Sequence, residues 1–183
     1  AANWLKKEGY ATDPTYPDKL IQIMDQHAPL NTKEHILKVP YEYQLDNKSG
    51  TGYRECFSSS CAMVARFYGK IGNDDSYNII RKKYGDSTDV HAQIKALNEL
   101  HLNATFIQNG TAANLEEEIN NGYPIPVGWL HRGPTSNPTG SGHWSVIIGY
   151  TPTHVIFNDP NGEADLTNGD RRSTRLNSSH LVI

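Results

Sequence analysis

CFSSSCAMVARFYG (residues 56–69) is the stretch from which the fold of this 183-residue chain can be worked out. Its apolar side chains recur at the spacing of one helix face, at Met63, Val64 and Phe67. Gly69 follows them, and glycine is common directly after a helix end. A loop of polar residues and glycines comes before. The sequence therefore predicts a helix over Phe57–Tyr68, with Cys56 at the junction between loop and helix.

The rest of the chain divides into helical and strand-like segments. Three more helices are predicted, over Asp74–Lys83, Asp89–Leu100 and Ala112–Asn121. Asp89 is a suitable N-cap residue for the second of these. Strands are predicted over Leu37–Tyr43, Thr105–Gln108, Ile125–Leu130, His143–Gly149 and His154–Asn158. Because most helices precede most strands, the pattern is typical of an α+β domain.

Composition and charge exclude several classes of protein. The net charge is −3, which argues against a nucleic-acid partner bound through bulk positive charge. No apolar stretch approaches the roughly 20 residues of a membrane span. Two cysteines cannot form a disulfide framework. The histidines show no zinc-binding spacing, and the loop 46–52 lacks the acidic spacing of a calcium loop, so no metal and no cofactor is expected.

Cys56 is the first candidate for chemistry. A helix N-terminus presents unpaired N–H groups and a partial positive charge, which favour a thiolate, the nucleophilic form of cysteine. The alternative for Cys56 is a small buried apolar residue, the common role of a free cysteine. Cys61 lies inside the helix with nothing near it to activate it, and we expect it in the core.

A thiol nucleophile needs a base, and His143 is the candidate. It begins an apolar strand after a glycine-containing loop, while Asn158 and Asp159 end the next strand. In a hairpin the end of the second strand lies beside the start of the first, so either residue could reach His143 and fix its tautomer. The alternatives are a surface histidine and a turn residue before Pro160. Gln44 precedes Cys56 and could donate to an oxyanion together with the Cys56 N–H.

Trp129 and Trp144 are the candidates for substrate binding. Both lie on predicted strands and could line a groove. The alternative for each is packing in the core.

Several short motifs together resemble the C39-like cysteine peptidases of the papain-like superfamily. They are VPY (39–41), Gln44, CFSSSCAM (56–63), GHWSVIIGY (142–150) and NDP (158–160). The resemblance spans about Leu37–Asp165. It implies a papain-like fold, with N-terminal helices packed on a C-terminal antiparallel sheet. It also implies Cys56 as nucleophile, His143 as general base and acid, Asp159 as the residue that orients His143, and Gln44 in the oxyanion hole. Phe57-Ser58 replaces the Gly-Pro usual in the family, and the Gln-to-Cys gap is longer.

The N-terminal region has a resemblance of its own. Residues 9–21 look like the end of a bacterial glucosaminidase domain, which cleaves glycan strands of peptidoglycan, and a helix is predicted to start near Pro17. We therefore divide the chain into a glucosaminidase-like remnant or linker (1–35), a C39-like domain (36–170) and a non-native tail (171–183). The tail resembles translated vector sequence.

The function expected from these resemblances is hydrolysis of peptide amide bonds, in stem or cross-bridge peptides of peptidoglycan, through a thioester. A glucosaminidase-like segment beside a C39-like domain suggests a phage endolysin or another cell-wall hydrolase. We expect a monomer that acts in the cell wall or periplasm, made in the host cytoplasm or carried on a virion. The alternatives are an idle C39-like peptide-binding module, a bacteriocin leader-peptide protease, and other thiol chemistry such as transglutaminase-like transfer.

Overall fold

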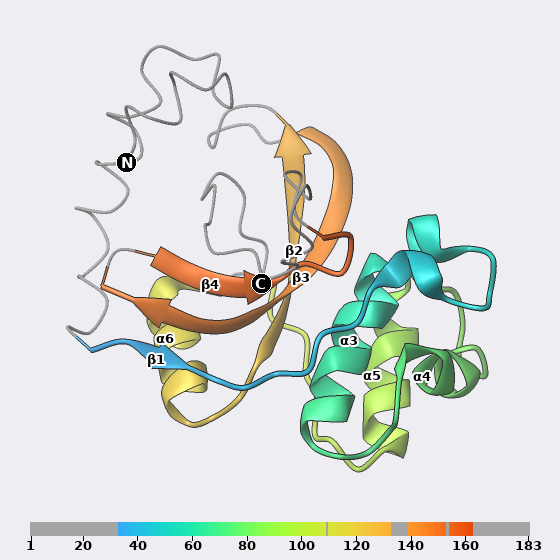
Figure 1. Ribbon diagram of the computed structural model, residues 1–183, viewed down its shortest axis with the longest axis horizontal. Helices are drawn as coiled ribbons and strands as arrows, with labels where there is room; N and C mark the ends of the chain where they lie inside the picture. The colour runs from blue at the N-terminus through green and yellow to red at the C-terminus, as the bar shows by residue number, and fades with distance from the viewer. Residues whose placement is uncertain (1–32, 109, 133–138, 153, 163–183) are drawn as a thin grey trace.

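The computed structural model describes residues 33–108, 110–132, 139–152 and 154–162. Its helices are α3 (Cys56–Phe67), α4 (Asp74–Arg81), α5 (Val90–Glu99) and α6 (Ala112–Asn120), and two short 3₁₀ turns, η1 (Gln44–Asp46) and η2 (Gly52–Arg54), precede α3. The helices α3, α4 and α5 lie together beside the sheet (Figure 1). The predicted helix near Pro17 and the tail 171–183 lie outside the described residues.

The sheet is antiparallel and is organised around one long strand. Its strands are β1 (His35–Ile36), β2 (Ile125–Arg132), β3 (Thr139–Thr151) and β4 (His154–Asn158). β3 pairs with each of the other three. The class is therefore α+β, as predicted, with helices packed on an antiparallel sheet.

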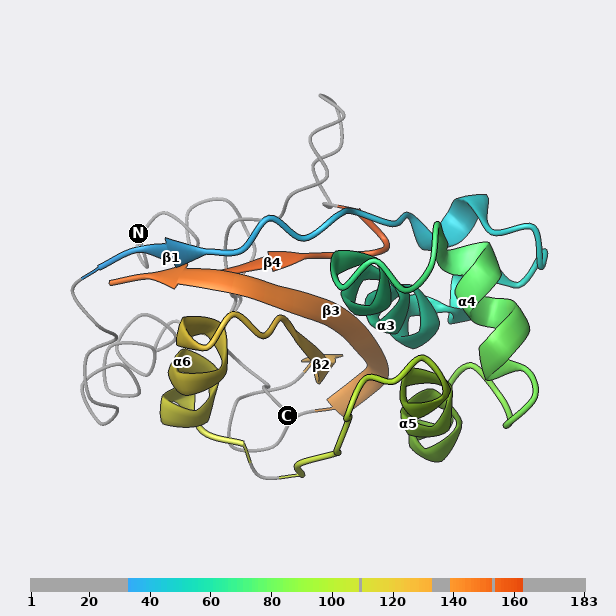
Figure 2. The same cartoon turned by 90° about the horizontal axis from the view of Figure 1, so that it is seen from below.

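Alternate side chains of β3 pack against helices on opposite faces of the sheet. Val146 and Ile148 cluster with Met63 and Val64 of α3, whereas Ile147 joins a second cluster with α6. Successive residues of a strand point to opposite faces, which explains the alternation. Figure 2 shows α3 and α6 on the two sides of β3. Burial of this apolar run therefore fixes α3, with Cys56 at its start, against the sheet.

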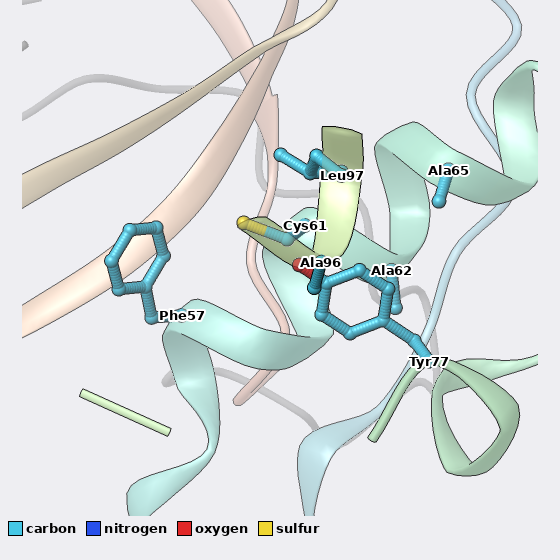
Figure 3. Packing of buried hydrophobic residues seen from close by; sticks show 7 residues of the cluster. All are labelled: Phe57, Cys61, Ala62, Ala65, Tyr77, Ala96 and Leu97. Atoms are coloured by element: carbon cyan, nitrogen blue, oxygen red, sulfur yellow. The ribbon is translucent and has the colours of Figure 1, made fainter. Parts of the chain in front are cut away.

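A third apolar cluster joins α3 to α4 and α5. Figure 3 shows the Cys61 sulfur beside Leu97 of α5, and Tyr77 of α4 lying across the small residues of the same cluster. Cys61 is only 1% exposed, so the expectation of a core position is confirmed. Small side chains dominate this interface, which allows the helices to approach closely.

The helix ends follow the capping signals of the sequence. Gly69 adopts a φ of +67°, and the N–H of Lys70 reaches back to the carbonyl of Ala65, which closes α3 in a Schellman motif. Asp89 caps α5 through the N–H of His91, as predicted. α6 begins with a capping box between Thr111 and Asn114 that the sequence analysis did not identify.

Two predicted strands are wrong. Leu37–Tyr43 is not a strand: the N–H of Leu37 still bonds to the sheet at Ile148, but pairing stops there and Pro40 offers no N–H to resume it. Thr105–Gln108 is exposed and irregular, because no neighbouring strand offers a hydrogen-bonding edge within the described part of the chain.

One predicted strand boundary also changes. His143 does not begin its strand. β3 starts at Thr139, because Gly142 pairs with Leu130 and Thr139 with Arg132. His143 therefore sits within a paired strand rather than at a free edge.

Candidate active site

Cys56 is the first residue of α3 and is partly exposed. The N–H of Ser59 makes the first helical bond, to the carbonyl of Glu55. The N–H groups of the first turn before Ser59 have no partner within the helix, so the end of α3 at which Cys56 lies carries free donors and partial positive charge.

His143 and Asp159 meet at the open end of the β3–β4 hairpin. His143 Nε2 lies 2.8 Å from Asp159 Oδ1. The register pairs Val146 with Asn158, so Asp159 continues past the last pair toward His143. Asp159 is itself held in place: its Oδ1 accepts the N–H of Asn161, and its carbonyl accepts the Tyr41 hydroxyl.

His143 also forms a side-chain hydrogen bond with Cys56. Because Nε2 binds Asp159, Nδ1 is the ring nitrogen left to face the sulfur. Burial alone lowers the pKa of His143, but the hydrogen bonds and charges of Asp159 and Cys56 outweigh it and raise that pKa to about 9. The ring is therefore protonated at neutral pH while it contacts these two side chains.

The hydrogen bonds of Asn158 lead away from His143. The Nδ2 of Asn158 donates to the carbonyl of Val39 at 3.2 Å, and its Oδ1 is buried without a hydrogen-bond partner among the described residues. Of the two neighbours between which the sequence could not choose, Asp159 is the one that reaches the imidazole.

Gln44 is buried in η1, close to the residues that precede Cys56. Its Nε2 donates to the carbonyl of Gly52 at 2.8 Å, and its backbone N–H donates to Pro160 beside Asp159. A Cβ on Gly52 would lie 2.2 Å from the Gln44 carbonyl oxygen, so only glycine allows this close approach. The long segment between Gln44 and Cys56 thus folds back on itself. Of the two hydrogens on Gln44 Nε2, the bond to the Gly52 carbonyl uses one.

A buried polar network fixes the loop that carries Gln44 to the start of α3. Asn78 of α4 donates to Glu55 and to Asn47, at 2.7 and 3.2 Å. Asn47 in turn donates to the carbonyl of Gln44 at 2.8 Å. Neither Asn78, inside α4, nor Glu55, directly before α3, was predicted from the sequence, because a single polar residue gives no local signal of its burial.

Trp144 packs against Phe57 next to the candidate site. The two rings are stacked, with centroids 3.5 Å apart and planes inclined by 5°. Phe57 follows Cys56 and Trp144 follows His143, so the stack joins α3 to β3 at the residues next in sequence to the two reactive ones. Trp129 lies opposite His143 in the β2–β3 pairing, and its side chain lies outside the described set.

Gly128 provides the space for the Trp144 indole. A Cβ there would lie 2.8 Å from Trp144 Cε2. We expect Gly128→Ala to displace the indole and to lower the free energy of unfolding by about 1–3 kcal/mol. Urea unfolding measures this difference. Gly142→Ala is the matched control, because a Cβ at Gly142 meets no atom of the described residues within 4 Å. Equal stabilities of the two variants would contradict a role of Gly128 in making room for the indole.

A cavity of about 580 Å³ adjoins the Phe57–Trp144 stack. It lies between α3, α5, α6 and the start of β2, and it is lined mainly by apolar side chains. Cys56, His143 and Asp159 are not among its lining residues, but Phe57 and Trp144, which follow Cys56 and His143 in the sequence, are. Trp144 therefore both packs in the core and lines a hollow next to the reactive groups.

The described residues contain no group of three or more His, Cys, Asp or Glu side chains placed to hold a metal ion. None of their helices has the length and apolar character that crossing a membrane requires.

The comparison with protein families identifies the class. The family model described as the Peptidase_C39 like family matches residues 36–177, and this chain belongs to that family. The match supports a cysteine peptidase-like protein with a papain-like α+β fold, and it extends past Asp170 into the predicted tail. No curated protein and no solved structure matches the chain.

Proposed function

We propose that this chain is a cysteine peptidase that hydrolyses amide bonds in peptidoglycan peptides through Cys56, His143 and Asp159. One observation carries the proposal: the His143 ring binds Asp159 at 2.8 Å on one side and hydrogen-bonds Cys56 on the other. This is the nucleophile–base–orienter arrangement of acyl-transfer enzymes.

Each group has a defined part in forming the acyl-enzyme. His143 holds the proton of the Cys56 thiol, and the sulfur attacks the carbonyl carbon of the substrate. The oxyanion accepts hydrogen bonds from the Cys56 N–H and from the Gln44 Nε2 hydrogen that Gly52 does not use. When the C–N bond breaks, His143 gives its proton to the leaving amine, and a thioester remains on Cys56.

Water completes the reaction. His143 takes a proton from a water molecule, which attacks the thioester carbon. The C–S bond then breaks, the acid product leaves, and the proton on His143 restores the starting pair. Asp159 keeps Nε2 as a donor throughout, so that Nδ1 always faces the sulfur and the substrate.

The substrate assignment rests on the N-terminal segment. The resemblance of residues 9–21 to the end of a glucosaminidase domain favours a two-activity cell-wall hydrolase, phage-encoded and acting at the cell wall. Trp144 and Trp129 are proposed to border the path of the peptide.

Thiol labelling and peptidoglycan digestion test the proposal together. With iodoacetamide at pH 7, Cys56 is expected to react at least about 100-fold faster than Cys61 in the folded protein, because burial raises the pKa of Cys61 to about 12. Both cysteines lie in the tryptic peptide of residues 55–66, so fragmentation of that peptide by tandem mass spectrometry assigns the label to each thiol and gives the two rates.

Digestion of purified peptidoglycan by the same protein is expected to release new amino termini. Equal labelling of the two cysteines, or release of reducing sugars alone, would contradict the proposal. Tight peptide binding without turnover would identify an idle binding module instead. Cleavage confined to leader peptides would identify the bacteriocin-processing alternative.

A further inference from the structure

The cavity beside the Phe57–Trp144 stack follows one face of α3. Phe57, Cys61, Val64 and Tyr68 line it, at helical spacing. We call it the α3 groove. Phe57 and Tyr68 are eleven residues apart, or about 16 Å along a helix at 1.5 Å per residue. One end of the groove therefore adjoins Cys56 and His143, and the other end lies past the last turn of α3.

The wall of the groove is apolar and includes exposed aromatic and aliphatic side chains. Phe106 and Ile107 line it and are 43% and 49% exposed. Large apolar side chains left open to water beside a hollow are typical of a binding surface. The groove thus offers apolar contacts along most of its length.

The far end of the groove differs in chemistry. Tyr68, Tyr123 and Glu118 line it, and both tyrosines are substantially exposed. Burial raises the pKa of Tyr68, and the charges of Tyr123 and Glu118 raise it further, so the three groups lie within electrostatic range of one another. This end of the groove thus combines two aromatic rings with a carboxylate.

No lysine or arginine of the described residues lines the groove beside Glu118. Among the described residues that line the groove, Glu118 is the one carboxylate. Its carboxylate makes no ion pair or hydrogen bond with the described part of the chain. A carboxylate flanked by tyrosine rings binds a basic side chain through charge and cation–π contacts.

We propose that the α3 groove binds an extended peptide substrate that carries a lysine or arginine about five residues from the cleaved bond, with the basic side chain seated between Tyr68, Tyr123 and Glu118. The spacing follows from the length of the groove, because extended chain rises about 3.3 Å per residue. The inference rests on the proposed peptidase function for the position of the cleaved bond, but binding to the groove does not depend on turnover.

Binding is tested first, on a protein that cannot cleave. The probe is a fluorescein-labelled twelve-residue peptide of Gly, Ala and Leu with one lysine. The control peptide has norleucine in place of the lysine, which keeps the aliphatic part of the side chain and removes its charge. With the Cys56→Ala variant, we expect the lysine peptide to bind about three- to tenfold more tightly by fluorescence anisotropy.

Two matched variants test whether Glu118 causes the preference for the lysine peptide. Glu118→Gln in the same background is expected to remove the preference for lysine. Glu117→Gln, one residue away on α6, exposed and outside the groove, is expected to keep it. Equal binding of both peptides to the parent, or the same loss in both variants, would overturn the basic-residue site.

Cleavage then tests the spacing. Wild-type protein is incubated with peptides in which the lysine moves one position at a time, and mass spectrometry locates each cut. Cuts are expected about five residues from the lysine, and cuts at unrelated distances would overturn the spacing. A wild type that binds the lysine peptide through Glu118 but cleaves neither these peptides nor peptidoglycan would contradict the peptidase proposal and leave the binding site standing.

Discussion

Replacing Cys56 by alanine is expected to lower the rate of peptide hydrolysis by about 10⁴-fold or more, because removal of the nucleophile leaves only binding and oxyanion stabilisation. Alanine is compatible with the first turn of a helix, and Cys56 is partly exposed, so the fold of the variant should not change. Initial rates on peptidoglycan, with circular dichroism as the check of folding, measure the effect.

Cys61→Ala is the matched control for Cys56→Ala. Cys61 lies five residues later on the same helix, is fully buried and contacts Tyr77 rather than the His143 ring. The control variant is expected to lose some stability through a small cavity. Cys61 borders the α3 groove but is only 1% exposed, so a bound peptide meets almost none of its surface, and activity per folded molecule is expected to stay unchanged. A control variant as inactive as Cys56→Ala would mean that packing of α3, not the Cys56 thiol, determines the rate.

The second large effect is expected at Asp159. In Asp159→Asn the carboxylate charge that stabilises protonated His143 is lost, and the fixed orientation of the ring is weakened. Hydrolysis should fall by about 10²- to 10⁴-fold. Asn161→Ala, an exposed substitution that keeps the backbone N–H bonded to Asp159, is the control and is expected to leave hydrolysis unchanged.

The pH profile separates positioning by Asp159 from a structural role. Since the pKa of His143 is raised to about 9, kcat/KM of the wild type should decline as the pH rises through about 9, where the ring loses its proton. In Asp159→Asn a contributor that raises this pKa is removed, so the decline should move to lower pH. Reduced activity of Asp159→Asn with an unchanged pH profile would contradict the role of Asp159 in positioning His143.

Much of the fold could be read from local sequence. β4 (His154–Asn158) has the predicted bounds, and α3 begins one residue before the prediction, at Cys56 itself. These features depend on residues a few positions apart: apolar periodicity, an N-cap or a glycine after a helix. The predictions for Leu37–Tyr43 and Thr105–Gln108 were wrong because a strand also needs a paired edge, which a local pattern cannot supply.

Some features of the candidate site could likewise be predicted from the sequence, whereas others depend on the tertiary structure. The motifs indicated Cys56 at a helix start and His143 on a strand, and they narrowed the third residue to Asn158 or Asp159. Hairpin register and the bond from Asn158 to Val39 decide between those two. The partners of Gln44 likewise depend on how the loop around Gly52 folds back.

The sequence by itself determined the helix that begins at Cys56, the α+β order of elements and the candidate reactive residues, because short-range periodicity and capping encode them. Only the tertiary structure decided that Asp159 holds His143, that Phe57 stacks on Trp144, and that a groove along α3 ends at Glu118. Each of these contacts joins residues far apart in the chain, and their approach depends on strand register and on helix packing against the sheet.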